Sequence, residues 1–238
     1  QQGRPVYVAA QEAYVMDGDS LSVPLTFVAA DGLEVTKTFT FAAGDHAVQL
    51  NYTIANNSDS AKQFQQYGQL KQTMAVPDEG SMFMPTYRGA AYSSSEDSYE
   101  KYSFDDIVDE NLRVVTQAGW VSMIQHYFVA AWVPPQEETN NIYTRALQNT
   151  YATIGYTGAI TTLQAGETTE LNSYLYLGPK LQDRLKELAE YLDLTVDYGP
   201  LFMISQILFD MLVWFHSLVN NWGVAIIVIT IVVKGLMY

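Results

Sequence analysis

Histidines and paired acidic residues are the side chains in this sequence whose chemistry could support proton transfer or metal binding. The chain has three histidines, His46, His126 and His216. They are widely separated, and none lies in an HExxH motif or at ligand spacing from a carboxylate. We therefore interpret each histidine as a structural or exposed residue.

Three pairs of acidic residues could bind calcium or form a glycosidase dyad, namely Asp17/Asp19, Asp105/Asp106 and Glu137/Glu138. None has partner ligands at the spacing of a known motif, so we interpret the pairs as solvated loop residues. The sequence also lacks a GxSxG elbow, a P-loop and a GxGxxG motif, and residues 155–158 (GYTG) are predicted to form a turn. We expect no catalytic residue, no metal site, no cofactor and no enzymatic activity.

The charge balance of the chain is strongly acidic. Its formal net charge is -14, and residues 1–178 hold 20 Asp and Glu against 8 Lys and Arg. Such a surface repels nucleic-acid phosphates and anionic lipid headgroups, and no basic patch is visible in the sequence to reverse this effect. Cysteine is absent, which excludes disulfides and thiolate metal sites but assigns no compartment.

Residues 20–54 alternate between apolar and polar side chains, which is the period of a strand with one buried face. Two turns interrupt the alternation, at Asp31-Gly32 and at Ala43-Gly44-Asp45. Glycine and aspartate tolerate the positive φ of tight hairpin turns. We therefore predict a meander of three antiparallel strands.

Further short strands are predicted at residues 67–76, 112–116, 141–147, 151–156, 160–163 and 170–177. Residues 119–134 are too densely apolar to show a period, and we assign them to a strand because aromatic and β-branched residues dominate. Residues 78–110, rich in Gly, Ser, Pro and acidic side chains, are predicted to be surface loops. Many short strands with frequent turns favour a β-sandwich over a sheet of alternating strands and helices.

The pattern becomes helical after residue 178. Pro179 suits a first helical turn, and leucines recur at helical spacing in the residues that follow, Leu181, Leu185, Leu188 and Leu192. The next segment, residues 199–221, is apolar except for a narrow polar stripe made by Gln206, Asp210, Ser217 and Asn221. It is either a core helix of a larger helical region or a helix in the membrane interface with Trp214 at headgroup level.

The final residues, 222–238 (WGVAIIVITIVVKGLMY), are almost uncharged. As a helix they would extend roughly 25 Å, at about 1.5 Å per residue, slightly less than a bilayer core of about 30 Å. A lipid-facing cation at Lys234 would cost on the order of 2.5 to 3.5 kcal/mol. Lys234 is therefore either a lysine that reaches the far interface or a charge in a polar cavity within the membrane.

Several stretches together resemble the YidC-type membrane protein insertases of Gram-negative bacteria. They are KQTMAVP, YRGAAYSSSEDSYEKYSF, GWVSMIQHYFVAAWVP, LDLTVDYG and ISQILFDMLVWFHSLVNNWGVAIIVITIVVKGLMY. The resemblance runs from about Arg4 to Tyr238, and its final stretch is the most specific part.

The resemblance implies a mainly β fold, a periplasmic β-supersandwich that is similar to mutarotase-like domains and incomplete at its N-terminus. Residues 1–178 would form the sandwich, 179–198 its helical end and connector, 199–221 an amphipathic interfacial helix, and 222–238 a truncated transmembrane helix. Residues 1–198 would lie in the periplasm of a protein of the bacterial inner membrane. Trp214 and Trp222 would be anchors at the membrane interface.

The resemblance also implies a function in the insertion, folding and assembly of inner-membrane proteins. Expected partners are nascent membrane proteins, the Sec translocon with its accessory subunits, and the lipid bilayer, without nucleic acid. In the family, the first core helix contributes a cation, usually arginine, to a hydrophilic groove within the membrane, and Lys234 occupies the matching position. A fixed charge shared with water there would lower the cost of drawing a polar substrate tail inward.

Two other functions are compatible with the residues. The chain could be a membrane-tethered periplasmic domain that binds or modifies carbohydrate, with residues 200–238 serving only as an anchor. It could also be a scaffold that docks the Sec machinery through its acidic loops. A tether would tolerate any residue in place of Lys234, whereas a groove charge would not tolerate an acidic one.

Overall fold

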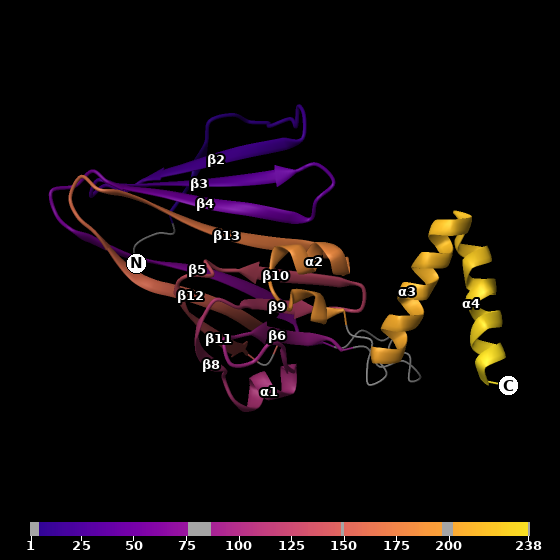
Figure 1. Cartoon of the computed structure of the whole chain (residues 1–238). Helices are drawn as coiled ribbons and strands as arrows, with labels where there is room; N and C mark the ends of the chain where they lie inside the picture. The colour runs from indigo at the N-terminus through magenta and orange to yellow at the C-terminus, as the bar shows by residue number, and fades with distance from the viewer. Residues whose placement is uncertain (1–4, 76–86, 149, 197–201, 238) are drawn as a thin grey trace. The chain divides into compact units, whose positions relative to one another are not determined.

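The computed structural model describes residues 5–75, 87–148, 150–196 and 202–237 (Figure 1). The chain divides into two compact units, Gln1–Thr195 and Val196–Tyr238. The described strands all lie in the first unit. Several predictions fall partly outside the described residues. These are the sandwich at residues 1–4, strand 67–76 at its last residue, the loops at residues 78–86, the connector at residues 197–198, the helix 199–221 at its start and the helix 222–238 at Tyr238.

The first unit is a sandwich of two antiparallel sheets. The larger sheet has the strand order β1-β2-β3-β4-β13-β10-β9-β6-β7, with bounds β1 (Val8–Ala9), β2 (Ser20–Val28), β3 (Leu33–Ala42), β4 (Ala47–Asn56), β6 (Gly89–Ser93), β7 (Glu100–Tyr102), β9 (Trp120–Ile124), β10 (Phe128–Val133) and β13 (Thr168–Pro179). The smaller sheet has the order β5-β12-β11-β8, with bounds β5 (Lys62–Thr73), β8 (Arg113–Gln117), β11 (Thr139–Leu147) and β12 (Tyr151–Leu163). The predicted mainly β sandwich is therefore confirmed.

Strands β2, β3 and β4 form the meander predicted for residues 20–54. Gly32 and Gly44 lie in its two turns with φ values of +89° and +73°, a region that glycine adopts without steric cost. The alternation has the predicted cause, because one face of β4 is turned into the protein and Leu33 and Val35 of β3 pack on the same side. Ile54 on that face packs in a cluster with side chains from both sheets, namely Leu33, Val35, Tyr52, Phe64, Leu163 and Leu171.

The main core lies between the smaller sheet and strands β6, β9 and β10. Its buried members are Leu70, Ala90, Tyr92, Ile107, Val121, Met123, Ile142, Ala152, Ile154 and Tyr156. The sheets approach closely at Gly68, where a Cβ would lie 2.5 Å from Cε1 of Tyr156 and 2.9 Å from Cδ2 of Trp132. Glycine at this position lets the Tyr156 and Trp132 rings meet edge to face, with centroids 6.4 Å apart.

The apolar stretch 119–134 is extended, as predicted, but it forms two strands joined by a tight connection. Strands β9 and β10 pair with each other, and all five residues of β9 are buried. The stretch shows no period because both of its faces are covered. Val121 belongs to the core between the sheets, whereas Trp120 donates from Nε1 to the carbonyl oxygen of Glu190 at 3.0 Å on the helical side.

The prediction of surface loops for residues 78–110 was wrong for β6, β7 and the helix that follows them, whereas residues 95–98 are exposed and lie outside regular elements, as predicted. Strand β6, GAAYS, is fully buried and pairs with β7 and β9. The sequence did not predict this strand, because small residues such as glycine and alanine have low β propensity. A short helix, α1 (Phe104–Asp109), follows it and buries the side chain of Ile107.

Two local predictions were also wrong. Residues 155–158 do not form a turn, because β12 continues through them with a register shift between Thr157 and Ile160. Pro179 does not start a helix, because it still pairs with Phe128 in the sheet. Helix α2 (Gln182–Leu188) begins three residues later, and a 3-10 helix, η1 (Leu192–Thr195), completes the helical end. Both elements bury leucines, Leu185 and Leu192.

Candidate functional site

The second unit consists, in its described part, of the helices α3 (Phe202–Val219) and α4 (Trp222–Met237), which pack against each other (Figure 1). Two asparagines form the corner between them. Asn220 has a φ of +52°, which asparagine tolerates better than most residues, and its N–H donates to the carbonyl oxygen of His216 at 2.7 Å. Oδ1 of Asn221 accepts from the N–H groups of Gly223 (2.9 Å) and Val224 (3.2 Å), and so caps α4.

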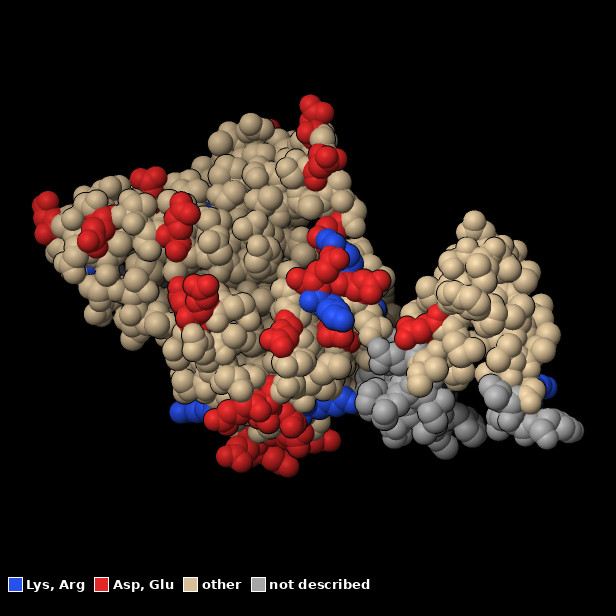
Figure 2. All heavy atoms as spheres, viewed as in Figure 1, with Lys and Arg blue, Asp and Glu red and all other residues tan. Residues whose placement is uncertain are grey.

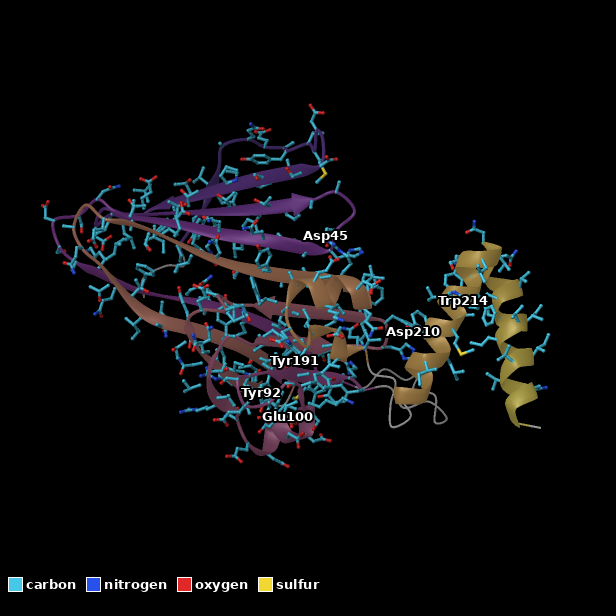
Figure 3. All side chains as sticks on the ribbon, in the orientation of Figure 1. Asp45, Tyr92, Glu100, Tyr191, Asp210 and Trp214 are labelled. Carbon is cyan, nitrogen blue, oxygen red and sulfur yellow. The ribbon has the colours of Figure 1, made fainter. Side chains whose placement is uncertain are left out.

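Aromatic rings gather beside this corner. The rings of His216 and Trp222 are stacked, with centroids 3.8 Å apart and an angle of 13° between their planes. Trp214 contacts Phe215 edge to face at 5.0 Å. Asp210 lies one turn before Trp214 on α3 (Figure 3), so Trp214 borders the polar stripe of that helix. Both tryptophans are half exposed, at 58% for Trp214 and 50% for Trp222.

The two helices expose much apolar surface. Ala225 is fully buried, whereas large apolar side chains along both helices are exposed, namely Ile207, Phe209, Val213, Leu218, Val219, Val224, Ile226, Ile227 and Ile231. Leaving such surface in water costs roughly 25 cal/mol per Å², so an apolar patch of this kind is typical of contact with lipid or with further protein.

Lys234 lies in the last turn of α4 with an exposed side chain. It follows Ile227 and Ile231 at helical spacing, and both of these are exposed, so Lys234 shares their side of α4. No described carboxylate lies within ion-pair distance of its Nζ atom. The structure thus places Lys234 on an exposed, apolar side of α4. Among the described helices, none is long and apolar enough to cross a bilayer.

Among the acidic pairs and histidines of the first unit, Asp106 and His46 make structural contacts. Asp106 accepts hydrogen bonds from Ser103 in the capping box of α1. His46 contacts Tyr176 edge to face at 6.1 Å. Within the described ranges, no three His, Asp or Glu side chains gather as metal ligands would. Acidic side chains are scattered over the face seen in Figure 2 and gather most densely near α1.

Sequence reasoning missed one cluster of side chains that is a further candidate site. A shallow hollow of about 360 Å³ lies on the smaller sheet, and two arginines, Arg113 and Arg145, line it together with Tyr143. The sequence interpretation found no basic patch, because the two residues are far apart in the chain and meet only through the pairing of β8 with β11. The available signal was that β5, β8, β11 and β12 contain no Asp or Glu.

The fold and the second unit define a class of protein: a mainly β sandwich domain followed by a pair of apolar helices. The chain belongs to the YidC family, since the family model described as the YidC periplasmic domain matches residues 1–211. The predicted resemblance is therefore confirmed.

Two relatives match the chain along almost its whole length. The membrane protein insertase YidC of Pseudoalteromonas atlantica is 54% identical over 235 residues, which cover 99% of this chain and 43% of that protein. The membrane protein insertase YidC of Pseudoalteromonas translucida is 48% identical over 237 residues, which cover 100% of this chain and 43% of that protein. The chain thus spans less than half the length of these relatives.

Solved structures resemble the sandwich at low sequence identity. An alpha-galactosidase, AgaA from Geobacillus stearothermophilus in complex with raffinose, matches with a TM-score of 0.50 and 12% identity over 74% of this chain and 27% of its own. A galactose mutarotase-like protein from Clostridium acetobutylicum matches with a TM-score of 0.48 and 7% identity over 72% of this chain and 66% of its own. At such identity, the first likeness concerns the fold alone.

Proposed function

We propose that this chain is part of a membrane protein insertase that assists the insertion, folding and assembly of inner-membrane proteins. The observation that carries the proposal is the 54% identity, over 99% of the chain, to a protein named membrane protein insertase YidC. The exposed apolar surface of α3 and α4 supports the membrane location that this function requires, because such a surface is typical of contact with lipid or with further protein.

We assign residues 1–178 to the periplasmic sandwich and 179–198 to its helical end and connector. Residues 199–221 are assigned to an interfacial helix, and residues 222–238 to the start of a transmembrane helix. Helix α4 has 16 residues, roughly 24 Å at about 1.5 Å per residue, which is most of a bilayer core of about 30 Å. Trp214 and Trp222, near the corner, would lie at headgroup level, where indole rings are favoured.

In this arrangement Lys234 acts as a fixed cation within the membrane. Its side of α4 is apolar, so within a bilayer its charge is tolerated only where water or polar groups reach it. Such a cation attracts the polar, often acidic, tail of a nascent membrane protein and lowers the cost of drawing that tail partway across. The apolar part of the substrate then enters the lipid. The Sec translocon is proposed as a further partner, which delivers substrates to the sandwich side of the protein.

The test replaces Lys234 in the full-length protein and follows insertion of a short substrate whose translocated tail is acidic. Lys234→Arg should retain insertion, Lys234→Ala should reduce it, and Lys234→Glu should abolish it because the charge is reversed. Lys186→Glu, at an exposed position of α2, is the matched control for charge reversal and should not change insertion. Equal insertion by the Lys234→Glu variant and the wild type would exclude the groove charge and leave α4 as a tether.

A further inference from the structure

The smaller sheet has an outer face that carries cations and no carboxylate. None of the 26 Asp and Glu residues falls in its four strands. Residues that are paired in an antiparallel ladder point to the same side of the sheet. Leu70, Ile142 and Ile154 point into the core. Because successive side chains of a strand point to opposite faces, their neighbours along each strand point outward. The outward rows are Lys71–Thr153–Arg145, Gln69–Gly155–Tyr143–Arg113 and Tyr67–Thr157–Asn141–Val115.

The hollow of about 360 Å³ lies on this face, with Arg113, Tyr143 and Arg145 among its lining residues. The Tyr143 ring lies across Gly155, where a Cβ would be 2.9 Å from the phenol oxygen, and its hydroxyl donates to Oε1 of Gln69 at 3.0 Å. The phenol is thereby fixed over β12, on the side of β11 that faces away from Arg113. Burial raises the pKa of Tyr143, so this ring stays uncharged at neutral pH.

The cations of this face are available to a partner. Arg113, Arg145 and Lys71 are exposed, and no described carboxylate forms an ion pair with any of them. The ammonium group of Lys71 lies 3.9 Å from the centre of the Tyr151 ring and extends the positive surface toward β5. Three cations without a counterion are unusual in a chain whose net charge is -14.

The spacing of the two arginines fits carboxylates on an extended chain. Arg113 is opposite Tyr143, and Arg145 is two residues further along β11, so the arginines are diagonal neighbours about 7–8 Å apart at their Cα atoms. Side chains at positions i and i+2 of an extended peptide are separated by about 6.6 Å. Each guanidinium can hold one carboxylate through two parallel N–H···O bonds.

We propose that the outer face of the β5-β12-β11-β8 sheet binds an acidic, extended segment of another polypeptide. Arg113 and Arg145 each pair with a carboxylate of that segment, and the segment also packs against the Tyr143 ring, which lies over β12. The proposal does not depend on the insertase function, because it concerns a surface of the sandwich that the sequence and the strand register define by themselves.

The test measures binding of a fluorescein-labelled peptide of alternating Asp and Ser to the whole chain in a nonionic detergent, by fluorescence anisotropy. We expect binding that weakens as salt rises, and an affinity about tenfold lower for Arg145→Gln, since a charge-assisted hydrogen bond is lost. Arg113→Gln should have a similar effect. Lys186→Gln removes one exposed cation elsewhere and is the matched control, which should bind as the wild type does.

Further measurements distinguish binding of an acidic peptide from unspecific charge attraction and from lipid binding. The same peptide with Asn in place of Asp should not bind, and Arg145→Lys should bind with intermediate affinity because it keeps the charge without the fork. Equal losses in Arg145→Gln and Lys186→Gln would overturn the proposal, since the attraction would then be unspecific. Binding of anionic phosphatidylglycerol vesicles through Arg113 and Arg145 without binding of the peptide would also overturn it and assign the face to lipid.

Discussion

The imidazole of His216 lies parallel to the indole of Trp222, with ring centroids 3.8 Å apart and planes at 13°. His216 belongs to the last turn of α3, and Trp222 begins α4. The stack therefore links the two helices directly across the Asn220-Asn221 corner. A corner held by a ring stack and an N-cap resists bending more than a simple loop of the same length.

Replacing Trp222 with alanine should loosen this corner. An aromatic pair contributes about 0.5–1.5 kcal/mol beyond its area burial, so we expect amide hydrogen exchange at Gly223 and Val224 to become about two- to tenfold faster. Trp214→Ala removes an indole that contacts Phe215 rather than the corner, and it serves as the control. The same acceleration in both variants would mean that the stack with His216 does not stabilise the corner.

Replacing Gly68 with alanine would test how closely the two sheets pack. In Gly68→Ala the new methyl would meet Cε1 of Tyr156 at 2.5 Å and Cδ2 of Trp132 at 2.9 Å, so the rings must shift. Overpacking of this kind costs about 1–3 kcal/mol of unfolding free energy, measurable by urea denaturation. Gly158→Ala, whose Cβ has neighbours only at 3.9 Å, should cost about 0.5 kcal/mol or less. Equal costs in the two variants would contradict the close approach at Gly68.

The fold could be predicted from the sequence wherever a strand has one buried and one exposed face. The meander of β2, β3 and β4 alternates for this reason, with Val35 and Ile54 turned inward. The prediction was less accurate where both faces are covered, because it assigned β6 to a loop and did not divide β9 from β10. In β9 and β6 every residue is buried, so the apolar pattern carries no period, and the small residues of β6 resemble a loop.

Long-range pairing was beyond the reach of the sequence. Strand β13 joins the meander to the rest of the larger sheet by pairing with β4 on one side and β10 on the other. Nothing local in Thr168–Pro179 specifies these partners. The candidate sites show the same limit. Lys234, Trp214 and Trp222 lie in two consecutive helices and could be proposed from the sequence, whereas Arg113 and Arg145 become neighbours only through the register of β8 and β11.

Asp106 should make the first unit sensitive to acid. Its Oδ2 atom accepts from Oγ of Ser103 at 2.6 Å and from the N–H of Ser103 at 2.8 Å. These two bonds lower the pKa of Asp106 from its ordinary value of 3.8, with the side-chain bond the stronger cause. A lowered carboxyl pKa gives stability that is present above about pH 4 and is lost as the pH falls through the folded-state pKa.

The measurement compares urea unfolding of the wild type and Asp106→Asn at several pH values. At pH 7 the variant should be less stable by about 0.5–1 kcal/mol, the usual effect of losing a helix cap, and this difference should shrink as the pH falls below 4. Asp105→Asn removes the same charge outside the capping box and should change stability at pH 7 by less than about 0.5 kcal/mol. A difference for Asp106→Asn that stays constant with pH would contradict the role of its carboxylate.

The assignment of Trp214 and Trp222 to the membrane interface predicts the depth of both indoles. The chain has four tryptophans, and Trp120 and Trp132 belong to the packed sandwich, so lipid-borne quenchers should reach mainly the two in α3 and α4. In proteoliposomes, lipids brominated near the headgroup should quench fluorescence more strongly than lipids brominated at the chain ends, because indoles prefer headgroup level. The double variant Trp214→Phe, Trp222→Phe should lose most of this quenching. Stronger quenching by the deep bromines would show that the corner lies in the hydrocarbon core. Absence of quenching by either lipid would show that neither helix enters the bilayer.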